Sequence, residues 1–202
     1  MKISFAYNRN PIGPLGFREV PGWERKKFKQ ASDMTEYFGP ELFFGLELYK
    51  AYPNEKFLFI KRTLGGTSLY GCWNPNWSVE KATVKKEDKK PKLYFDFIEY
   101  SKEVLTSYDA SELNLCGMIW VQGESDHKPD IAFNSYGANL TELIKGVRGH
   151  FLTDDLPFMC LEIGRLKNEM KKIEVLGHYN YEGMKRIGTN FFNEYASKYL
   201  TQ

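Results

Sequence analysis

A short apolar run that stops abruptly in a polar turn constrains the fold of this chain more than any other stretch. Residues 115–121 (LCGMIWV) are apolar, and residues 122–126 (QGESD) follow with an amide, a glycine and two carboxylates. Buried strands of open α/β sheets end in this way, because polar side chains and a tight turn gather at the carboxyl edge of the sheet. The stretch therefore predicts an internal strand that leads into a site.

Strand and helix patterns alternate along the rest of the chain. Strands are predicted at residues 2–7, 56–64, 114–121 and 156–163, and helices at about 41–52, 93–109, 133–151 and 181–199. Crossovers of a dozen residues or more between successive strands are typical of parallel pairing. The pattern predicts an α/β protein with three layers, α/β/α, around a mainly parallel central sheet, in a single domain over residues 1–202.

The charge balance argues against several classes of partner. The chain has 28 basic and 26 acidic residues, a net charge of +2, which gives no general attraction to nucleic acid or to a membrane surface. No apolar run approaches the ~20 residues of a transmembrane helix, and the N-terminus lacks a signal-peptide core. We therefore expect a cytoplasmic protein by default, unless a segment upstream of Met1 carries a signal.

The lysine-rich segment 80–92 has two interpretations. It can be a solvated loop or a patch that binds polyanions. We favour the solvated loop, because the segment has no arginine and no interleaved aromatic residue.

The cysteines indicate neither a disulfide framework nor a zinc site. Cys72, Cys116 and Cys160 are odd in number and far apart in sequence. Cys116 and Cys160 lie in apolar runs, so we expect buried free thiols there, and we expect no metal and no cofactor.

Three loops follow three predicted strands, at residues 65–68 (GGTS), 122–126 and 164–165. In a parallel sheet these loops emerge at one edge, and the loop around His178 can return to the same edge. An imidazole as general base, a carboxylate that holds its tautomer and N–H donors for an oxyanion are the parts of acyl-transfer catalysis. No G-x-S-x-G elbow, P-loop or H-E-x-x-H motif is present, so the nucleophile is unknown.

Five sequence blocks, in order, resemble the sialate O-acetylesterase-like branch of the SGNH hydrolases, which includes acetylxylan esterases. They are F-G-P-E with F-G at 38–45, the K-to-W block with G-G-T-S at 61–73, W-V-Q-G-E-S-D at 120–126, the Y-to-R helix at 136–148, and G-H-Y-N with two later glycines at 177–188. The resemblance implies an SGNH-type α/β/α fold. It also implies removal of O-acetyl or similar acyl groups from small or oligosaccharide esters by serine-type hydrolysis, without a cofactor.

The resemblance also implies roles for individual residues. His178 would be the general base, and Glu124 would orient it or the neighbouring loops. The amide of Gln122 and the backbone N–H of Gly66 would be oxyanion-hole donors. Two further residues are candidates for substrate contact: Arg165, which ends a predicted strand, and Trp73, for which core packing is an equally weighted alternative.

The sequence departs from the family pattern in two places. The G-Q-S-N-M block that carries the family's nucleophilic serine is not found, and neither Ser4 nor Ser68 matches its context. Either the natural chain begins upstream of Met1, or residues 2–7 fill part of the gap left by that opening strand. The family's Asp three residues before the histidine is Val175 here, so the third triad member is Glu124 or none.

Two functions therefore stay open at this point. The first is a carbohydrate esterase. The second is an inactive esterase-like remnant that binds carbohydrate or serves in assembly.

Overall fold

The computed structural model describes residues 3–19, 36–161, 179 and 181–200. The chain divides into two compact units, which are described separately. The first unit comprises Met1–Phe5, Pro11–Phe59 and Gly164–Gln202, and the second comprises Ala6–Asn10 and Ile60–Ile163. The strands β1 (Ile3–Tyr7) and β5 (Phe57–Lys61) each pass from one unit into the other.

The strands near the N-terminus form two small sheets. β1 lies between β2 (Gly13–Pro14) and β5 in a three-stranded sheet, and it pairs with β2 in antiparallel fashion. β3 (Arg18–Glu19) and β4 (Glu36–Tyr37) form a separate antiparallel pair. Residues 2–7 were predicted as a strand, and β1 confirms it.

Two helices pack closely in the first unit. α2 (Glu41–Ala51) begins directly after Pro40, as predicted, because proline has no N–H to leave unpaired in a first turn. α8 (Tyr181–Tyr195) continues into the short π-helix η4 (Ala196–Leu200). A Cβ on Gly188 of α8 would lie 2.3 Å from the carbonyl oxygen of Pro40, so only glycine permits this close approach.

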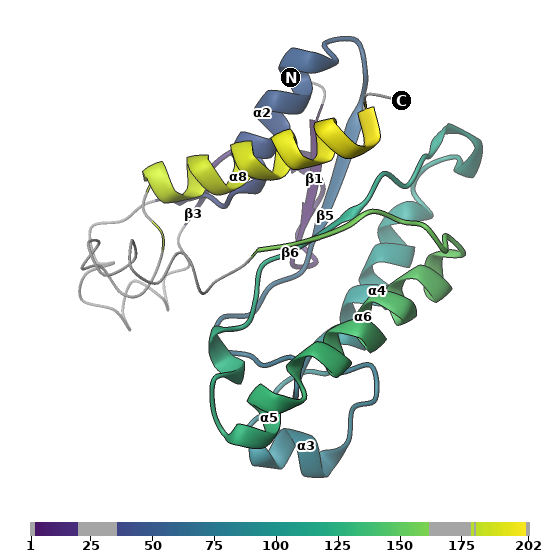
Figure 1. The fold of residues 1–202 in the computed structure, drawn as a ribbon. Helices are drawn as coiled ribbons and strands as arrows, with labels where there is room; N and C mark the ends of the chain where they lie inside the picture. Colours follow the sequence, from purple (N-terminus) through teal and green to yellow (C-terminus); the bar gives the residue numbers. More distant parts are fainter. Residues whose placement is uncertain (1–2, 20–35, 162–178, 180, 201–202) are drawn as a thin grey trace. The chain divides into compact units, whose positions relative to one another are not determined.

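The second unit is built on a parallel strand pair and two long helices. β6 (Met118–Trp120) pairs in parallel with β7 (Phe158–Cys160). α4 (Leu93–Leu105) and α6 (Tyr136–Phe151) contact each other (Figure 1). The buried core of this unit comprises Leu69, Cys72, Trp73, Leu93, Tyr94, Ile98, Trp120, Leu143, Val147 and Leu156.

Shorter elements connect these parts of the second unit. They are α3 (Val79–Val84), the 3-10 turns η2 (Ala110–Glu112) and η3 (Glu124–Asp126), and α5 (Asp130–Asn134). Residues 80–92 were interpreted as a solvated loop, which is wrong for α3. The side chain of Ser78 accepts a hydrogen bond from the N–H of Lys81, which caps the helix start.

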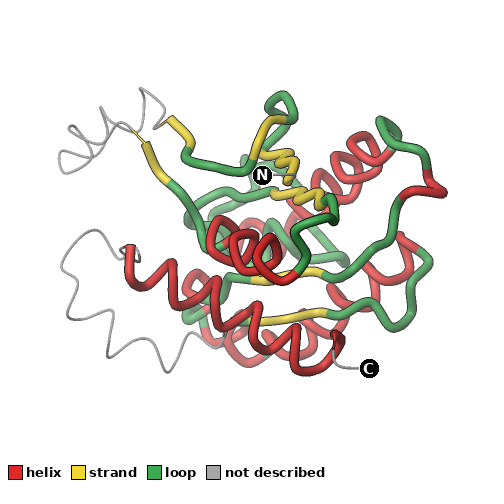
Figure 2. Tube along the Cα trace, turned by 90° about the horizontal axis from the view of Figure 1, so that it is seen from above, coloured by secondary structure: helices red, strands yellow, loops and turns green. Residues whose placement is uncertain are grey.

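The α/β class is confirmed, and helices make up most of the described regular structure (Figure 2). The described strands form small sheets of mixed direction, so a mainly parallel central sheet is not confirmed. In the described part of the chain, no helix has both the length and the apolar character that a membrane crossing needs.

The three cysteines are free, as expected, but their burial differs from the prediction. Cys72 is buried, whereas Cys116 and Cys160 are exposed. The expectation of buried thiols at those two positions was wrong, because Cys116 lies before β6 begins and Cys160 is the last residue of β7.

Candidate active site

Two loops of the second unit are joined by hydrogen bonds. We call residues 64–73 the glycine loop and residues 122–126 the acidic turn. The side-chain nitrogen of Gln122 donates to the carbonyl of Thr67 at 3.2 Å. The carboxylate of Asp126 accepts the backbone N–H groups of Leu69 and Tyr70 at 2.8 and 2.9 Å. The two motifs therefore form one structural site.

Asp126 is the centre of this connection. It is 2% exposed, and it also accepts the side-chain amide of Gln122 at 2.6 Å. Three donors converge on one buried carboxylate, which compensates the cost of removing the charge from water. Sequence reasoning did not select Asp126 as a site residue, although it is the last residue of the acidic turn.

The amide of Gln122 is fully engaged. Its two hydrogens point to the carbonyl of Thr67 and to Asp126, and its oxygen lies 3.2 Å from the hydroxyl of Tyr136. Burial, above all, raises the pKa of Tyr136 to about 12, and its hydroxyl donates more closely to the backbone carbonyl of Gln122, at 2.7 Å. An oxyanion can accept a hydrogen from Gln122 only by displacing one of these two acceptors.

A second buried carboxylate holds the glycine loop from another direction. Glu87 is 2% exposed and accepts the N–H and the hydroxyl of Ser68 at 3.0 and 2.8 Å, and the N–H of Cys72 at 3.1 Å. A Cβ on Gly71 would lie 2.3 Å from a Glu87 oxygen, so glycine is needed there. The fully buried hydroxyl of Ser68 thus donates to a carboxylate inside the protein.

Lysines that follow from α3 reach the same loops. Lys90 Nζ donates to the carbonyl of Gly66 at 2.6 Å and lies 3.7 Å from Glu87. Lys85 Nζ donates to the carbonyl of Ser125 at 2.5 Å and to that of Lys128. The sequence did not select these two residues, because nothing in segment 80–92 distinguishes them from its other lysines.

The predicted site residues are distributed as follows. Gly66 is exposed in the glycine loop with a left-handed φ of +67°, and Glu124 is exposed in the acidic turn. His178 and Arg165 lie outside the described residues, as does Val175. The contact between the predicted base and the acidic turn therefore stays a prediction.

Trp73, the last residue of the glycine loop, lies in the core of the second unit. It is 6% exposed, its ring packs edge-on against Trp120 at a centroid distance of 5.3 Å, and its N–H donates to the hydroxyl of Thr67 at 3.2 Å. These contacts describe the packing alternative, and contact with a substrate stays a prediction.

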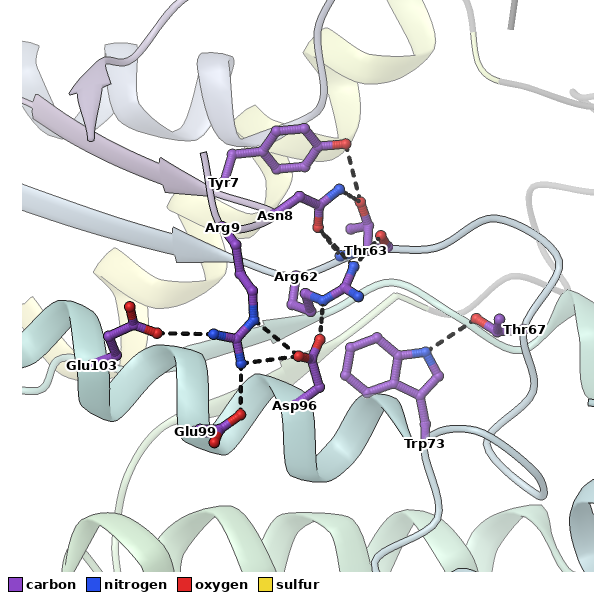
Figure 3. A network of polar contacts seen from close by, with 10 residues as sticks. All are labelled: Tyr7, Asn8, Arg9, Arg62, Thr63, Thr67, Trp73, Asp96, Glu99 and Glu103. Carbon is purple, nitrogen blue, oxygen red and sulfur yellow. Dashed lines mark hydrogen bonds and ion pairs between the residues drawn. The ribbon is translucent and has the colours of Figure 1, made fainter. Parts of the chain in front are cut away.

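A polar network fixes the residues that precede the glycine loop (Figure 3). Asn8 accepts the N–H of Thr63 at 2.8 Å and the guanidinium of Arg62 at 3.1 Å. Both Arg62 and Arg9 also bind Asp96 of α4. Partial burial works to raise the pKa of Asp96, but the hydrogen bonds and charges of the two arginines lower it overall.

Within the described part of the chain, no three His, Cys, Asp or Glu side chains are grouped so that they could hold a metal ion.

Comparison with known proteins identifies the class. A family model described as carbohydrate esterase, sialic acid-specific acetylesterase, matches residues 20–193, and the chain belongs to this family. None of the curated proteins compared with the sequence matches it. The fold is similar to that of an Arabidopsis thaliana protein solved by X-ray crystallography, with a TM-score of 0.62 and 15% identity over 98% of this chain and 82% of that one.

The family sets the kind of chemistry. A carbohydrate-esterase family implies a small-molecule sugar ester as the substrate class. The family match does not specify the acyl group, the sugar or the residues that act on them.

Proposed function

We propose that this protein is an ester hydrolase that removes O-acetyl or similar acyl groups from sugars by a serine-type mechanism. The observation that supports the proposal is the set of hydrogen bonds that joins the glycine loop to the acidic turn. Asp126 binds the N–H groups of Leu69 and Tyr70, and Gln122 binds the carbonyl of Thr67. The union brings the proposed oxyanion donors, Gly66 and Gln122, onto two loops that are fixed to each other. Such preorganised donors are what acyl transfer requires.

In this proposal His178 is the general base and Glu124 is the carboxylate that orients it. The exposure of Glu124 supports this role, because an exposed side chain is free to meet a partner. Gly66 donates its N–H to the oxyanion, and Gln122 donates after it exchanges one internal hydrogen bond. Arg165 and Trp73 are proposed to contact or support the sugar. The fold that we propose for the whole chain is a single α/β/α domain with a mainly parallel central sheet.

The nucleophilic serine is not assigned to a residue. Ser68 does not fit, because its hydroxyl is fully buried and donates to Glu87 at 2.8 Å. A nucleophile has to reach both the substrate and the base, and this hydroxyl is held away from solvent.

A second candidate function rests on a specific observation. Both amide hydrogens of Gln122 are used within the protein, on Thr67 and Asp126. An esterase-like protein that binds acetylated carbohydrate without turnover, or that serves in assembly, needs no free oxyanion donor. The engaged amide of Gln122 therefore supports this second function.

One experiment separates the two functions. The full-length protein is incubated with a fluorophosphonate, which labels an activated serine, and in parallel with p-nitrophenyl acetate and an acetylated xylo-oligosaccharide. The esterase is expected to label at one serine and to release acetate faster than His178→Ala. Binding of the acetylated sugar by calorimetry, with no labelled serine and no difference from His178→Ala, supports the second candidate and overturns the first.

A further inference from the structure

Two lysines of one segment hold the backbone of both loops of the site. Lys90 Nζ donates to the carbonyl of Gly66 in the glycine loop at 2.6 Å. Lys85 Nζ donates to the carbonyl of Ser125 in the acidic turn at 2.5 Å. The segment that the sequence presented as a solvated loop is thus in contact with each loop that carries a proposed oxyanion donor.

The segment is itself well fixed, so the two ammonium groups have defined positions. The N–H of Glu87 donates to the carbonyl of Ala82 at 2.7 Å, and the N–H of Lys90 donates to the carbonyl of Glu87 at 2.9 Å. Between the lysines, the Glu87 side chain is buried and accepts three hydrogen bonds from the glycine loop. The backbone that carries both lysines is therefore fixed against the glycine loop.

The contact to Gly66 fixes the peptide next to the proposed N–H donor. A trans peptide is planar, so holding the carbonyl of Gly66 fixes the plane of the Gly66–Thr67 peptide. The N–H of Gly66 lies in the preceding peptide and is separated from this plane only by the φ and ψ rotations of Gly66. Gly66 has a left-handed φ of +67° and no side chain to restrict its rotation. Its position in the loop therefore depends on outside contacts, and Lys90 supplies a charge-assisted one.

We infer that Lys90 and Lys85 are positioning residues for the site. They act through the carbonyls of Gly66 and Ser125, and they set the geometry of the two loops that Gln122 and Asp126 then join. They touch no reacting atom in this scheme. An effect of these lysines on the reaction rate rests on the proposed esterase function. Their effect on the structure of the two loops rests on the hydrogen bonds alone.

The structural consequence is tested by amide hydrogen exchange, measured by NMR on the full-length protein. Lys90→Met removes the ammonium and keeps the chain length, Lys90→Arg keeps a charged donor, and Lys89→Met is a matched control at the exposed neighbouring lysine. The amides of Ser68 and Leu69, which donate to Glu87 and Asp126, are expected to exchange roughly tenfold faster in Lys90→Met, because one charge-assisted hydrogen bond that holds their loop is lost. Lys90→Arg restores most of the protection, and Lys89→Met changes nothing.

The catalytic consequence is tested by steady-state kinetics with p-nitrophenyl acetate. In Lys90→Met and Lys85→Met, kcat is expected to fall roughly tenfold to a hundredfold with little change in KM, since a small misplacement of donors affects the transition state most. Lys90→Arg recovers part of kcat. If Lys90→Met does not fold, Lys85→Met and Lys90→Arg supply the same comparison.

The two arms fail separately. Absence of acetate release in the unaltered protein refutes the proposed function, and hydrogen exchange still decides the structural role. Exchange rates and kcat of Lys90→Met equal to those of Lys89→Met, in an active protein, overturn the positioning role and leave the esterase proposal standing.

Discussion

Substitution of Asp126 by asparagine tests the buried carboxylate that joins the two loops of the site. One carboxylate oxygen accepts the N–H of Tyr70, and the other accepts the N–H of Leu69 and the amide of Gln122. In Asp126→Asn, one oxygen becomes an NH2 group, which then faces a donor whichever way the amide turns. The least costly orientation still loses the hydrogen bond from Tyr70 and leaves a buried donor without an acceptor.

The loss of stability follows from one lost hydrogen bond and one buried donor left without an acceptor. A hydrogen bond to a charged group contributes about 1.5–3 kcal/mol, and an unmet buried donor adds its own desolvation cost. We expect Asp126→Asn to lower the free energy of unfolding by about 2–4 kcal/mol. For a chain of this size a loss of about 3 kcal/mol corresponds to a fall in Tm of roughly 6–12 °C.

The assay is urea unfolding followed by circular dichroism. The midpoint is expected to fall while the slope stays unchanged, because the surface exposed on unfolding is the same. Glu124→Gln, two positions away and exposed, is the control and should stay within about 0.5 kcal/mol of the unaltered protein. An Asp126→Asn protein as stable as this control would refute the reasoning.

Three further outcomes are expected. Gly71→Ala should lower the free energy of unfolding by about 1–3 kcal/mol in urea, because the new Cβ would lie 2.3 Å from an oxygen of Glu87. Gly65→Ala is the control, since its Cβ would meet nothing within 4 Å. Asp96→Asn should destabilise at pH 7, and the difference should close as the pH falls below about 4, because a carboxyl with a lowered pKa stabilises only while it is ionised. Burial, and then the charge of Glu87, raises the pKa of the Cys72 thiol to about 12. A thiol reagent applied to the folded protein should therefore modify the exposed Cys116 and spare the buried Cys72. Equal modification of the two cysteines would contradict this.

The sequence predicted helices well where local chemistry decides them. The helices predicted at 41–52 and 93–109 are α2 and α4, and most of the one predicted at 133–151 is α6. The strands came out shorter than predicted, because an apolar run shows which residues can be buried but not how many of them find a pairing partner. β6, for instance, covers only Met118–Trp120.

The site was harder to predict because its strongest contacts join residues that are far apart in sequence. The sequence predicted that the glycine loop and the acidic turn lie close together, and hydrogen bonds join them. The reason it gave, one edge of a parallel sheet, is not confirmed, because the strands before the two loops belong to different small sheets. It could not show that Glu87, set among lysines, is buried against Ser68 and Cys72. Charge density suggested a solvated segment, and the tertiary hydrogen bonds outweighed that tendency.

The measurement that tests the central claim most directly is the initial rate of acetate release from an acetylated sugar by the full-length protein, compared with its His178→Ala variant. We expect release that depends on His178, with a rate that rises with pH because a general base has to be unprotonated to accept a proton. Equal rates for the two proteins at every pH would contradict it.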